Sequence, residues 1–199
     1  MNYFITAIDT DSGKTLVSAI FCEALKYDYW KPIQAGSPKD SDTIRSLTEN
    51  ITIHPEAYFL NTPASPHASA KIDGIEIDLK SVNAPKNSRL VIEGAGGCLV
   101  PLNDSEFVID LVPKANAEII LVADLYLGSI NHTLLTIELL KARKYPVKGI
   151  VFNGKSNPES ERIILHHSQY PALLRIQPED QINKAIVKKY AEILKNNLG

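Results

Sequence analysis

Short apolar runs alternate with segments of helical periodicity along this chain, and that alternation limits the fold more than any other feature. Four runs have the composition of buried strands: Tyr3–Ile5, Leu90–Ile92, Ile119–Ala123 and Val147–Phe152. The third run does not alternate with polar residues, which is typical of a strand covered on both faces. Apolar residues recur at helical spacing over 14–25, 130–143 and 182–194. Strands separated by helices predict βαβ units, so we expect an α/β fold with a mostly parallel central sheet flanked by helices.

Length and composition are those of one globular domain. The 199 residues are 44% apolar and 22% charged, with no internal repeat and no linker, so we expect a single domain over residues 1–199. A formal net charge of −2 provides no bulk attraction to nucleic acid or to a membrane. The chain shows neither a membrane-spanning run nor a secretory signal, and its two cysteines are far apart. We therefore expect a cytoplasmic protein without a disulfide framework.

The segment between the first strand and the first helix reads DTDSGKT over residues 9–15. A strand, a short loop with glycine and lysine, and a helix are the context of a phosphate-binding loop, in which backbone N–H groups face the phosphates. Lys14 would add a full charge near the β- and γ-phosphates, and the Thr15 hydroxyl would coordinate Mg²⁺. The strict motif has glycine at position 8, where this chain has isoleucine. An ordinary helix start, capped by Ser12 or Asp11, is the alternative.

A second glycine-rich segment, EGAGG over residues 93–97, follows the strand predicted at 90–92. We expect the strand to end at the carboxylate and the glycines to form a turn. Because ligands of parallel sheets lie beyond the carboxyl ends of the strands, Glu93 is expected at the same edge as the phosphate loop, where it could bind Mg²⁺. The glycines would let the backbone approach a ligand closely. The alternative is a turn with a solvated glutamate.

Four further positions are candidate binding residues, each with a plain structural alternative. Lys31 precedes a proline, which holds it on extended backbone, and it could bind an anionic substrate group or lie on the surface. Asp42 could be a third metal ligand or a helix cap. Backbone N–H groups over 128–131 could bind a carboxylate or simply begin a helix capped by Ser129. Asn153 offers a donor and an acceptor, which suits an adenine edge or a turn before glycine.

Taken together, these segments resemble the dethiobiotin synthetase family. The matching pieces occur in the family's order: T-x-x-D-T-D-x-G-K-T at 6–15, W-K-P-I-Q-A-G at 30–36, S-D at 41–42, P-A-S-P-H at 63–67, V-I-E-G-A-G-G at 91–97, L-G-S-I-N-H at 127–132 and G-I-V-F-N at 149–153. The resemblance implies a three-layer P-loop fold, ATP and Mg²⁺ as cofactors, and a homodimer. It also implies a reaction in which 7,8-diaminononanoate, CO₂ and ATP give dethiobiotin, ADP and phosphate through a carbamate and its mixed anhydride.

The resemblance also assigns roles to individual residues. The implied catalytic residues are Lys14, Lys31, Thr10 and Asp11, and the implied metal ligands are Thr15, Asp42 and Glu93. The implied nucleotide site consists of Asp11, Ser12, Gly13, Lys14, Thr15, Glu93, Gly96 and Asn153. The implied substrate site consists of Lys31, Ala35, Gly128, Ser129 and Asn131. Within these sets Lys31 would hold the carbamate, Asn153 would read adenine, and Gly128–Asn131 would bind the substrate carboxylate across the dimer interface.

Three alternatives to this interpretation concern other P-loop proteins. A related amide synthase would need a glutaminase domain, for which 199 residues leave no room. Partition and septum-site ATPases have a phosphate loop with an extra lysine near its start. At that place this chain has Ala7 and Ile8. A paralogue that binds nucleotide without turnover is the third alternative. It is suggested by Ala7 in place of the family's first loop glycine, and by the lack of a family tyrosine around 162–165.

Overall fold

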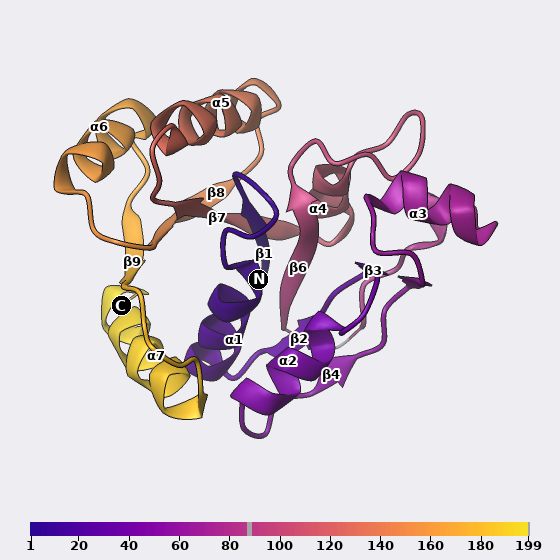
Figure 1. Cartoon of the computed structure of the whole chain (residues 1–199), viewed down its shortest axis with the longest axis horizontal. Helices are drawn as coiled ribbons and strands as arrows, with labels where there is room; N and C mark the ends of the chain where they lie inside the picture. The colour runs from indigo at the N-terminus through magenta and orange to yellow at the C-terminus, as the bar shows by residue number, and fades with distance from the viewer. Residues whose placement is uncertain (87–88, 199) are drawn as a thin grey trace.

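A computed structural model describes residues 1–86 and 89–198, and its centre is a parallel sheet (Figure 1). Within these residues seven strands pair in the order β4-β2-β6-β1-β7-β8-β9, every neighbour parallel. The strands are β1 (Asn2–Ala7), β2 (Asp28–Trp30), β4 (Ile53–His54), β6 (Leu90–Gly97), β7 (Ala117–Asp124), β8 (Val147–Asn153) and β9 (Ala172–Ile176). The chain therefore reverses its direction of winding at β1, the kind of switch point at which ligands bind in parallel sheets.

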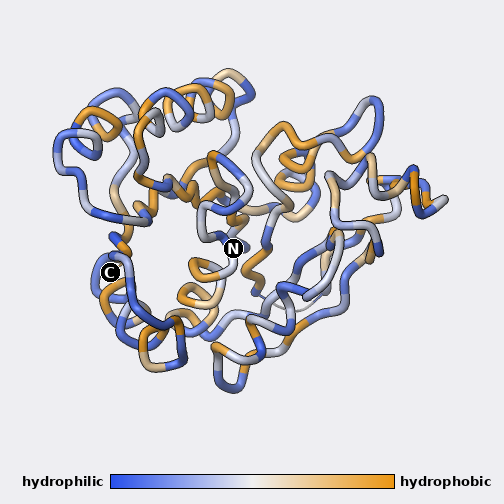
Figure 2. The backbone as a smooth tube through the Cα atoms, in the orientation of Figure 1, coloured by the Kyte–Doolittle hydropathy of each residue, from blue (hydrophilic) through white to orange (hydrophobic). Residues whose placement is uncertain are grey.

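Helices cover both faces of the sheet, which gives the three layers predicted from the sequence. They are α1 (Lys14–Leu25), α2 (Asp40–Leu47), α3 (Pro66–Asp73), α4 (Leu111–Lys114), α5 (Ser129–Ala142), α6 (Pro158–Ser168) and α7 (Lys184–Leu198), with single turns η1 (Leu79–Ser81) and η2 (Val108–Asp110). Hydropathy follows this layering, since the central strands are mostly apolar and the outer helices alternate (Figure 2). No helix in the described part of the chain has the length and apolarity needed to cross a membrane.

The two faces of the sheet are divided by the alternation of side chains along each strand. In β1, Ile5 and Ala7 pack in the cluster that contains residues of α1 and α7, while Phe4 packs in the opposite cluster with residues of α4. In β7, Val122 joins the first cluster, whereas Leu121 joins a third cluster with residues of α5 and α6. Central strands buried on both faces explain why the run at 119–123 shows no polar alternation.

A small parallel sheet, β3 (Ile33–Ala35) with β5 (Tyr58–Leu60), stands beside the main sheet. β3 follows β2 and leads to α2, whereas β5 follows β4 and leads to residues 63–66. Residues 63–66 and Asp40 of α2 thereby reach the carboxyl edge of β1 and β6. The α3 helix begins only at Pro66, as expected where proline at N1 leaves no amide unpaired. The sequence analysis did not predict this sheet, because its strands are only three residues long.

The predicted strands and helices are confirmed, with two corrections. The glycine-rich segment over 93–97 is not a turn, because it continues β6 in the middle of the sheet, where Ile5 pairs with Glu93 and Ala7 pairs with Gly97. The last helix begins at Lys184, two residues later than the apolar pattern suggested.

Candidate active site

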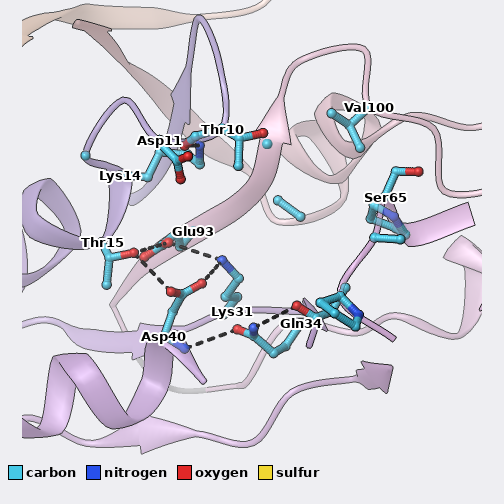
Figure 3. Close-up of a pocket in the computed structure, with 17 residues that line it drawn as sticks. Thr10, Asp11, Lys14, Thr15, Lys31, Gln34, Asp40, Ser65, Glu93 and Val100 are labelled. Carbon is cyan, nitrogen blue, oxygen red and sulfur yellow. Dashed lines mark hydrogen bonds and ion pairs between the residues drawn. The ribbon is translucent and has the colours of Figure 1, made fainter. Parts of the chain in front are cut away.

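A cavity of about 550 Å³ opens at the carboxyl ends of β1 and β6 (Figure 3). That volume lies within the range of small-molecule sites. Its walls come from the loop after β1, the segment after β2, the residues 63–66 and the end of β6. The lining residues are Thr10, Asp11, Gly13, Lys14, Thr15, Lys31, Gln34, Ala35, Asp40, Pro63, Ala64, Ser65, Pro66, Glu93, Ala95, Gly96 and Val100. Segments separated by up to 90 residues thus meet at one sheet edge.

The loop after β1 is held closed by its own side chains. The Lys14 Nζ donates to the carbonyl oxygens of Asp9 at 2.9 Å and Thr10 at 2.7 Å, and the Ser12 hydroxyl donates to Asp9 O at 3.1 Å. Gly13, the N-cap residue before α1, has φ +92, so the loop needs a residue there that tolerates left-handed backbone. The Asn153 side-chain amide at the end of β8 donates to Ser12 O at 2.9 Å and fixes the loop to the sheet.

Lys14 carries a charge that the fold leaves without a carboxylate at bonding distance within the described residues. Its side chain is 5% exposed. Burial lowers the pKa of Lys14 from 10.5 to about 8, while the nearby Glu93 acts in the opposite direction. The ammonium form still predominates at neutral pH, so an anion bound in the cavity would replace the weak carbonyl contacts by a strong one.

A compact group of oxygen atoms from Thr15, Asp40 and Glu93 lies in the cavity beside the loop (Figure 3). The Thr15 Oγ1 lies 2.9 Å from Glu93 Oε1 and 3.3 Å from Asp40 Oδ1. The Lys31 Nζ lies between the same carboxylates, 3.2 Å from Glu93 Oε1 and in an ion pair with Asp40 Oδ2. A hydroxyl and two carboxylates are hard donors that fit Mg²⁺, which completes its shell with phosphate and water. The described parts of the chain contain no cluster of three or more His, Cys, Asp or Glu side chains that could hold a metal ion.

Comparison with known proteins decides the family. A family model described as an AAA domain matches residues 1–185. The ATP-dependent dethiobiotin synthetase BioD of Cytophaga hutchinsonii is 58% identical over 98% of this chain and 97% of its own length. The enzyme of the same name from Christiangramia forsetii is 48% identical over 99% and 97%. This chain belongs to the ATP-dependent dethiobiotin synthetase family.

Solved structures show how widely the fold of this dethiobiotin synthetase family member is shared. A ParA family ATPase from Chlorobium tepidum covers 99% of this chain and 98% of its own, with a TM-score of 0.60 and 14% identity. The septum site-determining protein MinD from Pyrococcus horikoshii, complexed with Mg-ADP, covers 100% and 98%, with a TM-score of 0.56 and 14% identity. At such identities the likeness concerns the fold alone, and it confirms the P-loop architecture.

Nine of the residues predicted for the site line the cavity: Thr10, Asp11, Gly13, Lys14, Thr15, Lys31, Ala35, Glu93 and Gly96. Two others support the loop from behind, since Ser12 is 1% exposed and Asn153 donates to Ser12 O. Ala7, which replaces a family glycine, is the last residue of β1 and fully buried in the sheet. Its methyl group therefore packs in the core, and the positive φ that the loop requires is supplied by Gly13.

The predicted metal ligand Asp42 lies outside the cavity, and Asp40 occupies its expected place. The Asp42 side chain is 61% exposed and lies 2.6 Å from Arg45 Nη1 on the same helix. Because α2 begins at Asp40, a residue two positions later projects from nearly the opposite side of the helix. The contacts of the two side chains therefore favour Asp40 over Asp42 as the carboxylate of this segment that could hold a metal.

Two buried residues that the sequence analysis missed hold the carboxylates in place. The Tyr29 hydroxyl donates to Glu93 Oε2 at 3.0 Å. The Gln34 Oε1 accepts from the backbone N–H of Asp40 at 3.2 Å, and its amide donates to Gly36 O. The sequence signal that could have revealed them is a tyrosine and a glutamine inside short apolar segments. Such polar groups become buried, and buried polar groups need hydrogen-bond partners.

The predicted carboxylate-binding segment lies apart from this cavity within one chain. Gly128 and Ser129 line a separate hollow with residues from the start of α6, and Asn131 is exposed on α5. Gly128 is the N-cap residue before α5 and has φ +104, and the Ser129 Oγ accepts from Tyr126 N–H at 3.3 Å. The neighbouring Leu127 side chain is fully exposed. The role of the segment Gly128–Asn131 toward substrate stays a prediction.

Proposed function

We propose that this chain is an ATP-dependent dethiobiotin synthetase, closing the ureido ring of dethiobiotin from 7,8-diaminononanoate and CO₂ with release of ADP and phosphate. The observation that carries the proposal is the meeting of Lys14, Thr15, Lys31 and Glu93 at one cavity. They are the residues that a phosphoryl transfer to an anionic acceptor requires, since such transfers depend mainly on positioning and charge neutralisation. Curated relatives at 58% and 48% identity carry the same activity in their names.

The proposed reaction has three steps. One amine of the diamine adds to CO₂ and loses a proton, which gives a carbamate. A carbamate oxygen attacks the γ-phosphorus and ADP leaves, which gives a carbamic–phosphoric anhydride. The second amine attacks the carbamate carbon, the C–O bond to phosphate breaks, and a proton is released as the ring closes.

Lys14 and the loop are assigned to the phosphates. The buried ammonium, without a carboxylate at bonding distance among the described residues, would neutralise charge on the transferred phosphoryl group. Thr15, Asp40 and Glu93 would hold Mg²⁺, which supplies charge neutralisation at the phosphates when bound. Asp40 takes the place that the sequence analysis gave to Asp42.

Lys31 is assigned to the carbamate as a fixed positive charge. Burial disfavours its ammonium form, but the carboxylates of Glu93 and Asp40 outweigh burial and raise the pKa of Lys31 above 10.5. A lysine held in the charged form suits electrostatic anchoring of an anion and not proton abstraction. Ala35, Thr10 and Asp11 line the same cavity and would contact the diamine beside it.

The remaining assignments concern the base and the far end of the substrate. Asn153 stands at the end of β8 beside the loop, a place that suits contact with adenine. Gly128–Asn131 would bind the substrate carboxylate from a second subunit, because these residues do not reach the cavity of their own chain. A homodimer is proposed on that ground, and the cytoplasm remains the expected location.

The test is a component-omission assay. ADP release is measured with Mg²⁺-ATP, diaminononanoate and bicarbonate, and each is left out in turn while mass spectrometry follows the cyclic urea. The proposal expects ADP release and urea formation only in the complete mixture. ADP release that is indifferent to the diamine would refute it and indicate a general ATPase.

A further inference from the structure

Among the described residues, Tyr29 is the one donor that contacts Oε2 of the Glu93 carboxylate. Its hydroxyl lies 3.0 Å from Glu93 Oε2, whereas Thr15 and Lys31 contact Oε1 at 2.9 Å and 3.2 Å. Tyr29 is 0% exposed and Glu93 is 1% exposed. Three donors therefore divide between the two oxygens, and Oε1 is the one that lies beside Thr15, the other predicted metal ligand of this group.

The location of Tyr29 in the sheet explains the contact. Tyr29 pairs with Val91 and Trp30 pairs with Ile92, so Glu93 lies one position beyond the paired segment on the neighbouring strand. Tyr29 packs in the same cluster as the buried residues of α1. It does not line the cavity, so it cannot touch substrate directly.

Removal of the hydroxyl would free the carboxylate to turn. The terminal torsion of glutamate has only a weak intrinsic preference, so the orientation of the carboxylate plane is set by its hydrogen bonds. Without Tyr29, Oε2 would be a buried charged oxygen without a donor, which favours rotation toward Thr15, Lys31 or water. Any such rotation of the carboxylate would move Oε1 away from its place beside Thr15.

We propose that Tyr29 is a positioning residue that orients Glu93 for Mg²⁺ binding in the nucleotide complex. This inference rests on the proposed function, because Glu93 acquires a metal role only there. Partners that orient metal ligands commonly change metal affinity or activity by roughly 10–100-fold when removed. Tyr29 would therefore affect the metal while leaving contacts to the nucleotide itself unchanged.

The test compares Tyr29→Phe with Tyr145→Phe by calorimetric titration of Mg²⁺ into the protein–ADP complex. Tyr145 is a matched control, since its hydroxyl also donates to a carboxylate, Asp110 Oδ1 at 3.1 Å, away from the cavity. Tyr29→Phe is expected to raise the Mg²⁺ dissociation constant about tenfold or more. The affinity for ADP without metal and the KM for diaminononanoate should stay within twofold, and Tyr145→Phe should match wild type.

Unchanged Mg²⁺ affinity in Tyr29→Phe, with wild-type thermal unfolding, would overturn the inference. Equal weakening in both variants would also overturn it, because the effect would then be general destabilisation. The proposed function fails in a different way, in the wild type itself, if its ADP complex binds no Mg²⁺ or if ring closure is absent from the omission assay.

Discussion

Replacement of Gly13 by alanine tests whether the phosphate loop and β8 are locked together. Gly13 has φ +92, and an added Cβ would lie 2.4 Å from Asn153 Nδ2. The amide of Asn153 would have to move and would lose its hydrogen bond to Ser12 O. Gly128 is a matched control, because it is also the N-cap residue of a helix at positive φ, +104, and its added Cβ would meet no atom within 4 Å.

The magnitudes follow from these two environments. A side chain in left-handed backbone costs about 1–2 kcal/mol, and both variants share that term. The smaller entropy of unfolded alanine offsets about 0.4–1 kcal/mol, again in both. Only Gly13→Ala also loses the buried hydrogen bond of Asn153, about 1 kcal/mol. We expect the free energy of unfolding to fall by roughly 1 kcal/mol for Gly128→Ala and by roughly 2 kcal/mol for Gly13→Ala.

Equilibrium urea denaturation measures both losses, and a double variant isolates the contact. Asn153→Ala should destabilise the wild type by about 1 kcal/mol but should add little in the Gly13→Ala background, where the bond is already broken. Equal losses for Gly13→Ala and Gly128→Ala, or full additivity in the double variant, would refute the reasoning.

Three further predictions concern the charged groups of the cavity. Asp40→Asn should lower kcat/KM by roughly 10–100-fold while Asp42→Asn stays within about twofold, measured as ADP release; the reverse order would restore Asp42 as the ligand. Lys31→Gln should lower ring closure by roughly 100-fold or more with nucleotide affinity little changed; equal loss of both would contradict a carbamate role. The unfolded chain holds the Lys14 proton up to a pKa near 10.5 and the folded chain only to about 8, so rising pH between these values favours the folded state. Urea titrations at pH 7.5, 9 and 10.5 measure this effect. The free energy of unfolding of the wild type, taken relative to that of Lys14→Met, should rise with pH by at most roughly 3 kcal/mol. A difference that does not change with pH would argue against the lowered pKa of Lys14.

Local patterns were enough for four strands of the main sheet (β1, β6, β7 and β8), for the helices α1, α5 and α7, and for the phosphate loop, because each depends on residues adjacent in sequence. They did not reveal the shorter strands or the other helices. Glu93 and Lys31 were predicted at the site because parallel strands place their carboxyl ends at a common edge. The contact of Tyr29 with Glu93 joins residues 64 positions apart, and a single sequence carries no record of such a partner. The preference for Asp40 over Asp42 depends on where a short helix begins, and α2 has no side-chain cap that marks its start.

The glycine-rich segment shows a different limit of local reasoning. Glycines after a carboxylate favour a turn when they are considered alone. In the fold, β6 lies between β1 and β2, and pairing with β1 extends the strand as far as Gly97. Hydrogen bonds to a central neighbour thus override the weak preference of the residues themselves.

The central place of β1 has a consequence for how the chain is made. Its neighbours are β6 and β7, so that Tyr3 pairs with Val91 on one side and Glu118 on the other. Ribosomes add roughly 5–20 residues per second, so the first strand waits on the order of ten seconds before its second neighbour exists. During that interval Phe4 and Ile5 can pair with β6 alone, and only once residues 90–97 have been made, so the nascent chain depends on shielding from aggregation. A chain released before residue 117 would lack β7 and Asn153, so neither the far side of β1 nor the hydrogen bond that fixes the phosphate loop to the sheet would be in place.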